Sequence, residues 1–245
     1  MIVLAHLSDL HLDGRQCSTE RASRVMAYLE DLVGPPDAVL VTGDIADHGL
    51  PAEYEQARGI LSSRYRVLVC PGNHDERVGF RKVLLGQEPG TTPVNAVHRV
   101  AGATVAMCDS TIPGGDGGLL AEETLDWLDG VLAEEPDAPA FVCFHHPPVL
   151  LHSPFIDAIR QRGEHRLAEV VERHPNVVAL LCGHAHTPAA STFAGRPLLV
   201  APGVVSTLTL PWERGDALNF HLPPAVAFHV LDDNRRLTTH YHVVV

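Results

Sequence analysis

The sequence has 245 residues, of which 45% are hydrophobic, and its formal net charge is −12. The length suits one large domain, and we expect a single domain over residues 1–245. The negative charge argues against binding of a nucleic-acid polymer, because such binding depends on Lys and Arg at phosphates. No apolar run reaches the ~18 residues of a membrane-spanning helix, and the N-terminus lacks a signal-peptide pattern, so we expect a cytoplasmic protein without membrane contact.

Strands and helices alternate through the first 185 residues. Apolar runs of strand length lie at 1–7, 38–42, 66–70, 95–100, 103–108, 139–144 and 177–182. Helical spacing, with Pro at helix starts and stops, predicts helices at 21–33, 51–61, 77–85, 121–132 and 164–173. Such alternation favours an α/β sheet. Residues 111–118 are predicted to be a loop without an element of its own, and 149–163 a long connection.

The last part of the sequence is rich in predicted strands. They lie near 190–194, 197–201, 225–231 and 237–244. Residues 203–224 lie between them as an irregular stretch rich in Pro, Gly and polar groups. We expect the last 55 residues to complete a second sheet.

The five cysteines contain no C-x-x-C pair. Cys70, Cys143 and Cys182 lie in or at the ends of apolar runs, where we expect buried, reduced thiols that pack as small hydrophobic groups. A disulfide framework is not expected at this chain length.

Five of the predicted strands end in residues that can bind a metal ion. In chain order these residues are Asp9 and His11, Asp44, Asn73 and His74, His145, and His184 and His186. A Gly or Pro accompanies most of them and allows a sharp turn of the backbone. Ligands in α/β folds bind at the carboxyl ends of strands, so we expect these strand ends to converge. The sequence therefore predicts two metal ions, bridged by Asp44.

The predicted ligands are carboxylates, imidazoles and one amide carbonyl, without a thiolate. This set suits Mn, Fe or Zn, as divalent or trivalent ions, better than it suits a structural zinc site. Two ions about 3.5–4 Å apart can clamp the attacking and leaving oxygens of a phosphoryl transfer and lower the pKa of a bridging water. No G-x-S-x-G motif is present, and this chemistry needs no Ser or Cys nucleophile.

In this order the motifs resemble those of the calcineurin-like metallophosphoesterases, whose pattern is D-x-H, G-D, G-N-H-[DE], H near Pro and G-H-x-H. The resemblance implies a four-layer αββα sandwich, with two central mixed sheets flanked by helices. It assigns the first metal ion to Asp9, His11 and His186, and the second to Asn73, His145 and His184, with Asp44 as the bridge. It also implies that His74 protonates the leaving alkoxide or stabilises charge, a role that suits imidazole.

Two neighbouring residues leave alternatives open. In His145-His146-Pro147 either histidine can bind metal, and the family pattern H-x-P favours His145. Asp75 either orients His74 or serves as a plain turn carboxylate.

A narrower resemblance comes from the connecting segments, namely 42–49, 108–114, 125–128 and 144–149. They are similar to the bacterial class III cyclic nucleotide phosphodiesterases and the related glycerophosphodiesterases. The resemblance implies hydrolysis of 3′,5′-cyclic nucleotides, cAMP above all, to 5′-monophosphates by a metal-bridging hydroxide, in a protein that forms a homodimer. The alternatives are a broad phosphodiesterase for 2′,3′-cyclic nucleotides or glycerophosphodiesters, a protein phosphatase, and a scaffold that has lost its metals.

A small phosphodiester substrate needs a wall against which a nucleobase can stack. The candidates lie in residues 203–224 and are Trp212, Asn219, Phe220 and His221. A surface loop or a dimer contact is the alternative interpretation of this stretch.

Overall fold

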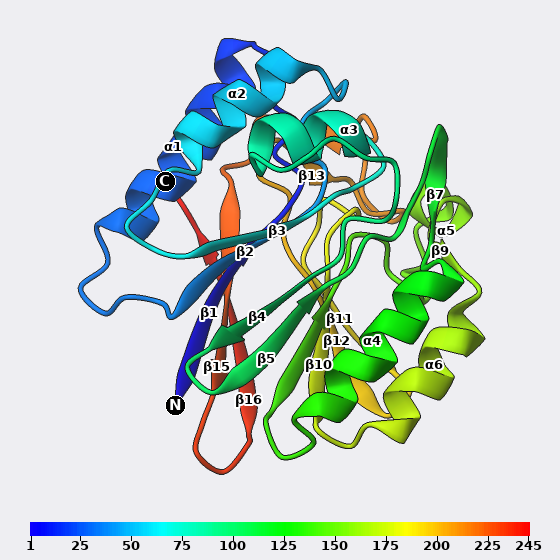
Figure 1. The fold of residues 1–245 in the computed structure, drawn as a ribbon. Helices are drawn as coiled ribbons and strands as arrows, with labels where there is room; N and C mark the ends of the chain where they lie inside the picture. Colours follow the sequence, from blue (N-terminus) through cyan, green and yellow to red (C-terminus); the bar gives the residue numbers. More distant parts are fainter.

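The computed structural model describes residues 1–245 and contains two large sheets (Figure 1). The first sheet has the strand order β16-β15-β1-β2-β3. Its strands are β1 (Ile2–Leu7), β2 (Ala38–Thr42), β3 (Val67–Cys70), β15 (Ala225–Leu231) and β16 (Leu237–Val243). The parallel strands β1, β2 and β3 are extended by β15, which pairs antiparallel with β1, and by β16, which pairs antiparallel with β15. The sheet is therefore mixed.

The second sheet has the strand order β11-β12-β10-β8-β5-β4. Its strands are β4 (Ala96–Val100), β5 (Ala103–Met107), β8 (Ala140–Cys143), β10 (Val177–Cys182), β11 (Ala189–Phe193) and β12 (Arg196–Val200). The four central strands are parallel, and an antiparallel strand lies at each edge. This sheet is therefore mixed as well.

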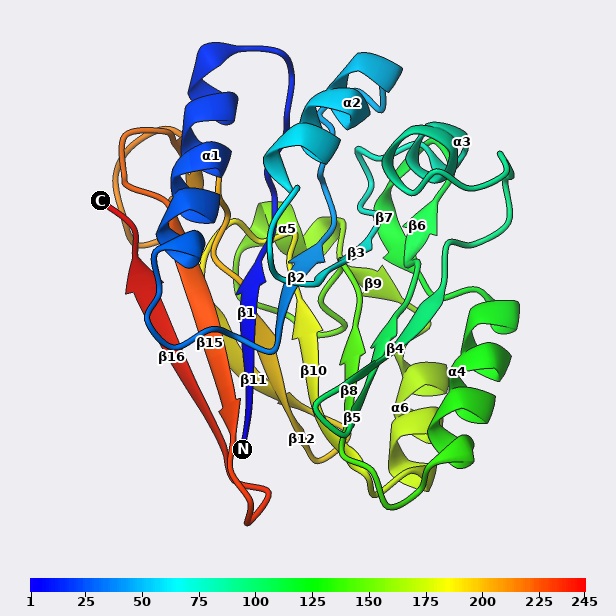
Figure 2. The ribbon, with the colours of Figure 1, turned by 60° about the vertical axis from the view of Figure 1, so that its left-hand side comes forward.

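Helices cover the outer face of each sheet, and the inner faces pack against each other (Figures 1 and 2). The helices α1 (Gln16–Glu30) and α2 (Pro51–Ile60) cover the first sheet, and α4 (Glu122–Glu134) and α6 (Glu164–Arg173) cover the second. Between the sheets, Leu40 and Leu68 pack with Phe141 and Leu181. The predicted four-layer αββα sandwich is confirmed.

Burial on both faces explains why the central strands appear in the sequence as unbroken apolar runs. All residues of β2 and β8 are buried. All four cysteines within the sheets or at their ends, Cys70, Cys108, Cys143 and Cys182, are buried and free, and burial raises the pKa of each of these thiols. Cys17 is exposed and also free. None of the helices combines the length and the apolar character that crossing a membrane requires.

Two predicted connections contain elements that the sequence analysis missed. Residues 111–118, predicted to be a loop, form the hairpin of β6 (Thr111–Ile112) and β7 (Gly115–Leu119). The 149–163 connection contains α5 (Pro154–Ala158) and β9 (Gln161–Arg162), which pairs with β7. Glycine is depleted in strands, so the composition of β7 concealed it. Gly118 is needed there because a Cβ atom would lie 2.5 Å from Cβ of His146.

Other boundaries also differ from prediction. The helix predicted at 21–33 is α1, which begins five residues earlier, at Gln16. The prediction began too late because the first turn of α1 is mostly polar and carries no apolar stripe. The helix predicted at 77–85 is a short α3 (Arg77–Gly79) followed by a π-helix, Phe80–Leu84.

Of the last 55 residues, β11 and β12 extend the second sheet, but β15 and β16 extend the first, so the prediction of one completed second sheet was half wrong. A small ribbon, β13 (Thr207–Leu208) with β14 (Leu218–Asn219), lies within 203–224.

Candidate metal centre

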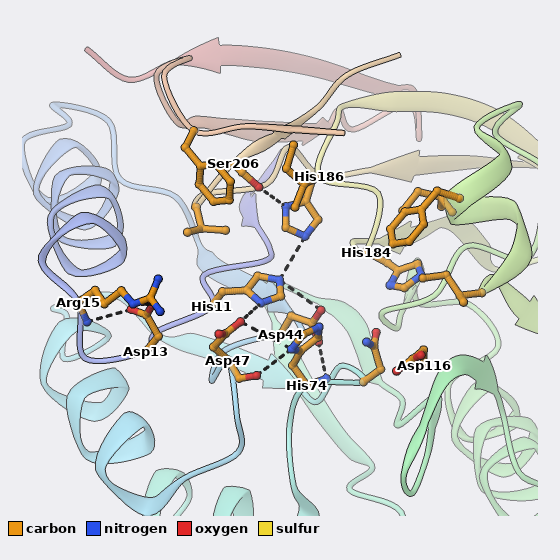
Figure 3. Close-up of a pocket in the computed structure, with 17 residues that line it drawn as sticks. His11, Asp13, Arg15, Asp44, Asp47, His74, Asp116, His184, His186 and Ser206 are labelled. Atoms are coloured by element: carbon orange, nitrogen blue, oxygen red, sulfur yellow. Dashed lines mark hydrogen bonds and ion pairs between the residues drawn. The ribbon is translucent and has the colours of Figure 1, made fainter. Parts of the chain in front are cut away.

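The carboxyl ends of β1, β2, β3, β8 and β10 lie at one edge of the sandwich, and side chains that follow them meet there. Figure 3 shows four of these side chains, namely His11, Asp44, His184 and His186. The structure brings together all the residues predicted as ligands: Asp9, His11, Asp44, Asn73, His145, His184 and His186. Most of these side chains are buried although they are polar or ionisable. Buried charge at a shared site marks a candidate for chemistry rather than for packing.

One group of donors consists of Asp9, His11 and His186, whose ligand atoms all lie within 4.8 Å of one another. Nε2 of His11 lies 3.2 Å from Nε2 of His186, and Oδ1 of Asp9 lies 3.6 Å from the same His186 atom. Two nitrogens bound to one ion at roughly 2.1 Å each would be separated by about 3.0–3.4 Å. The spacing therefore suits a common cation.

A second group gathers around His145. Its Nε2 lies 3.2 Å from Oδ2 of Asp44 and 3.1 Å from Nδ1 of His184. The same Oδ2 of Asp44 lies 3.4 Å from Nε2 of His11, a member of the first group. Asp44 thus lies between the two groups, where one carboxylate can serve both.

The backbone at the cluster adopts a conformation that residues other than glycine rarely use. Positive φ angles occur at Asp9 (57°), His11 (42°), Asp44 (50°), His184 (69°) and His186 (52°). Such strained conformations cost free energy and persist where the surroundings impose them, commonly at functional sites. The left-handed backbone turns the side chains at the strand ends toward one another.

Close backbone approach explains two glycines of the sequence motifs. A Cβ atom at Gly72 would lie 2.2 Å from Oδ1 of Asp44, and one at Gly183 would lie 1.8 Å from Oγ of Ser8. Neither distance is compatible with a side chain. These glycines therefore allow the loops from different strands to pack tightly around the donors.

Three of the candidate ligand histidines are held through one ring nitrogen, Nδ1. Nδ1 of His145 donates to the carbonyl oxygen of Thr42 at 2.6 Å. Nδ1 of His11 lies 2.9 Å from Oδ1 of Asp47, and Nδ1 of His186 lies 2.8 Å from Oγ of Ser206. Such outer partners fix the ring and leave Nε2 free for a metal. The sequence analysis assigned no role to Asp47 or Ser206, because neither is part of a ligand motif.

The structure separates the alternatives at His74, Asp75 and His146. Asp75 accepts hydrogen bonds from the backbone of Ile45, Ala46 and Gly72, so it is a turn carboxylate that ties two ligand loops together. The Nδ1 atom of His74 instead donates to the carbonyl oxygen of Asp47 at 2.8 Å. His146 bonds Oγ of Ser110 at 2.8 Å, whereas His145 faces Asp44, and this geometry favours His145 as the ligand.

Electrostatics at the cluster follow from burial and from the carboxylates. Burial alone would lower the pKa of His145, but Asp44 outweighs it, and the pKa of His145 is raised to about 9. Burial opposes ionisation of Asp44, yet His145 and His11 hold its pKa well below the usual value. For His184, burial and the neighbouring imidazoles His146 and His145 lower the pKa. The carboxylates at the cluster thus favour positive charge at its centre.

An unpartnered atom supports a metal at this site. Oδ1 of Asn73 is buried and has no hydrogen-bond partner. A buried polar atom without a partner is costly and needs an explanation. Two cations, bound to carboxylate, imidazole and amide donors of this kind, would provide it. The residues present therefore fit a dinuclear centre.

The cluster forms the floor of a cavity of about 460 Å³. Donor residues and His74 line one part of the cavity (Figure 3). Apolar side chains line another part, namely Phe155, Ile156, Ile159, Val205, Leu218 and Phe220. Phe220 is the one predicted wall residue that reaches this cavity, since Asn219 lines a separate pocket and Trp212 and His221 line neither. The volume lies in the usual range for small-molecule sites.

Comparison with known proteins gives relatives over most of the chain. A glycerophosphodiester phosphodiesterase from Enterobacter lignolyticus is 31% identical over 93% of this chain and 86% of its own length. A probable cyclic nucleotide phosphodiesterase from Rhodococcus erythropolis is 34% identical over 86% of this chain and 74% of its own. A cAMP/cGMP dual specificity phosphodiesterase from Mycobacterium tuberculosis is 31% identical over 87% of this chain and 70% of its own.

Solved structures and a family model agree with the fold. A dimetal phosphatase from Danio rerio superposes with a TM-score of 0.75 at 14% identity, and the match covers 100% of this chain and 96% of that one. The Calcineurin-like phosphoesterase family model matches residues 2–188, the part of the chain that contains every candidate ligand. The chain therefore belongs to the calcineurin-like phosphoesterase family, a family of metal-dependent phosphoesterases.

Proposed function

We propose that the protein is a metal-dependent phosphodiesterase that hydrolyses 3′,5′-cyclic nucleotides, with cAMP as the principal substrate, to 5′-monophosphates. One observation carries the proposal. Members of both donor groups and the shared Asp44 line one part of a 460 Å³ cavity, and apolar side chains line another part. Such a cavity offers the phosphodiester a cationic floor once metals are bound, and it offers a base an apolar wall.

The ligand assignment is part of the proposal. One ion is held by Asp9, His11 and His186, the other by Asn73, His145 and His184, and Asp44 is shared. When bound, the two ions supply positive charge for the phosphodiester and an activated water for its hydrolysis. Mn, Fe and Zn all accept these donors.

His74 is proposed as the acid that protonates the leaving alkoxide. It lines the cavity, and its Nδ1 donates to the Asp47 carbonyl, so Nε2 is the nitrogen left to hold a transferable proton. The backbone nitrogen of His74 also donates to Oδ1 of Asp44 at 2.9 Å, which ties the acid to the metal cluster. A positioned imidazole of this kind contributes roughly 10²–10⁴-fold to a rate.

The names of relatives support the substrate class and give a second candidate. Two of the relatives above are named for cyclic nucleotides, and the chain covers most of each of them. The relative from Enterobacter lignolyticus is named for glycerophosphodiesters and covers 93% of this chain. Glycerophosphodiesters are therefore the alternative substrate, because the same donors serve both kinds of diester.

We also propose the cytoplasm as the location. The five cysteines are all free, which suits a reducing compartment. Cell fractionation tests this proposal.

The homodimer that the family resemblance implies is proposed as well, and light scattering of the purified protein tests it.

Steady-state hydrolysis by Mn²⁺-reconstituted enzyme tests the substrate proposal. The substrates are 3′,5′-cAMP, 2′,3′-cAMP, glycerophosphocholine and bis(p-nitrophenyl) phosphate, with chelator-treated enzyme as the control. We expect the highest kcat/KM for 3′,5′-cAMP and no turnover without metal. A flat profile, or a preference for glycerophosphocholine, would contradict the cyclic nucleotide proposal.

A further inference from the structure

Two exposed aromatic side chains line the cavity from different parts of the fold. Phe155 belongs to α5 and is 62% exposed, and Phe220 belongs to the 203–224 stretch and is 49% exposed. Both lie in the same cavity as Asp44 and His74. Aromatic rings gain free energy when an apolar surface covers them, and they stack on flat ring systems. A nucleobase is such a surface.

The charges around the cavity favour a neutral group next to these rings. Four lining carboxylates, Asp13, Asp44, Asp47 and Asp116, face the cavity, and Arg15 is the one lining Lys or Arg. Arg15 is already paired, because its Nε lies 3.2 Å from Oδ2 of Asp13. A second phosphate would therefore meet more carboxylates than cations away from the metal site. A neutral heterocycle meets no such difficulty.

A buried arginine fixes the segment that carries Phe220. Arg21 of α1 is 8% exposed and has no carboxylate partner. Its guanidinium donates to the carbonyl oxygens of Val204 at 2.8 Å, Phe220 at 3.2 Å and Leu222 at 2.8 Å. A buried cation is costly unless it is fully hydrogen-bonded. Here the hydrogen bonds of the guanidinium group go to backbone carbonyl oxygens near both ends of the 203–224 stretch. They therefore fix the position of the backbone that carries Phe220.

We propose that Phe155 and Phe220 form a nucleobase subsite, and that Arg21 is the positioning residue that holds Phe220 in it. The proposal deepens the cyclic nucleotide activity and rests on it. The phosphodiester lies on the metal cluster, and the base lies against the two rings. The metal donors cannot distinguish one diester from another, so this wall gives the enzyme its preference for a substrate with a base.

The first test uses binding, which does not depend on turnover. Isothermal titration of the Mn²⁺-loaded protein compares 5′-AMP with ribose 5-phosphate, which has the same phosphate and sugar but no base. We expect tighter binding of 5′-AMP by the wild type, and Phe155→Ala and Phe220→Ala should each remove ~5–150-fold of that preference, the usual range for base stacking on an aromatic side chain. Equal affinity of the wild type for both ligands would overturn the subsite.

Kinetics provide the second test and a matched control. Phe155→Ala and Phe220→Ala should raise KM for cAMP with little change in kcat, and the loss in kcat/KM should be several-fold smaller for glycerophosphocholine. Trp212→Ala is the control, because Trp212 is a 73% exposed aromatic residue of the same stretch that does not line the cavity. A cAMP preference that survives both Phe variants overturns the subsite alone. A wild type without any cAMP preference overturns the proposed function instead.

The positioning role of Arg21 is tested by a double-mutant comparison. Arg21→Met should raise KM for cAMP about as much as Phe220→Ala does, and the double variant should lose no more than either single variant. Additive losses would show that Arg21 does not act through Phe220. Arg21→Lys, which keeps the charge but not the three-way donation, should lie between wild type and Arg21→Met. If Arg21→Met does not fold, Arg21→Lys and Phe220→Ala complete the comparison.

Discussion

At the scale of single residues, the outer partners decide how the donors point. The ligand motifs supply imidazoles and carboxylates, but Asp47, Ser206 and the Thr42 carbonyl hold three of the rings in place. A ring that is free to rotate would bind metal more weakly, because its orientation would have to be fixed on binding. The candidate ligands thus follow sequence motifs, whereas the residues that orient their rings do not.

We expect His74→Ala and Asp44→Ala to fail in different ways. His74→Ala should keep both metals and lose roughly 10²–10⁴-fold in kcat, because the proton for the leaving alkoxide is gone. Asp44→Ala should lose both the metals and the activity, because its carboxylate serves both donor groups. Elemental analysis of the purified variants beside cAMP kinetics separates the two results. Loss of metal in His74→Ala would show that our division of roles is wrong.

Asp47→Ala should weaken metal binding about 10–100-fold, because Nδ1 of His11 loses its acceptor. Competition with a fluorescent chelator measures this affinity. Asp13→Ala is the matched control, since Asp13 also lines the cavity but bonds Ser18 and the backbone of Arg15 rather than a ligand. Equal losses in the two variants would mean that general negative charge, and not ring orientation, sets the affinity.

At the scale of elements, the strand ends are where the sequence was most informative. Buried parallel strands appear as apolar runs, and the polar residues after them stand out, so the ligand loops could be predicted. The β6–β7 hairpin could not be, because Gly-rich strands lack a strand composition and depend on neighbours that are distant in sequence. The roles of Arg21 and Ser206 could not be predicted either, because their partners are distant in sequence. Arg21 bonds Phe220, 199 residues away, and Ser206 bonds His186, 20 residues away.

The tight packing of strand ends gives a prediction with a built-in control. Gly183→Ala should destabilise the protein and reduce metal binding, because its Cβ atom would meet Ser8 and the Thr42 carbonyl, 1.8 and 2.7 Å away. Gly130→Ala should instead stabilise by up to ~1 kcal/mol, since this exposed position of α4 has open space and Ala favours helix. Urea unfolding of both variants measures the difference. A stable, metal-binding Gly183→Ala variant would contradict the close approach.

At the scale of the whole molecule, a row of hydrogen bonds crosses the first sheet from its edge to the site. It runs from Thr239 of β16 to His229, then to His6, and ends at Oγ1 of Thr42, with distances of 2.8, 3.0 and 2.9 Å. Both histidines are fully or almost fully buried between the sheets. A satisfied polar row in an apolar interface fixes the register of the strands that it joins.

This row makes stability depend on pH. Burial lowers the pKa of His229 to about 3, while the unfolded chain keeps a value near 6.5. Below pH 6.5 His229 therefore binds a proton in the unfolded chain but not in the folded protein. The free energy of unfolding falls as the pH decreases toward 3. At pH 5 the loss from His229 is about 2 kcal/mol.

Urea unfolding at pH 7.5 and pH 5, with a chelator in every sample, measures the effect. His229→Gln should reduce the difference between the two pH values by about 2 kcal/mol relative to wild type. His240→Gln, at an exposed position of β16, is the control and should retain the full difference. An unchanged difference in His229→Gln would show that burial of this imidazole does not govern the acid sensitivity.

The position of β1 has a consequence for how the protein is made. β1 lies between β2 and β15, and it leads directly to Asp9 and His11. A ribosome that adds roughly 5–20 residues per second needs about 10–40 s to synthesise the chain between the end of β1 and the start of β15. All candidate ligands up to His186 are synthesised during that time. Until β15 is present, one edge of β1 stays unpaired, and an unpaired edge strand promotes aggregation. The nascent chain therefore contains its complete set of candidate ligands before residues 225–231 can cover that edge of β1.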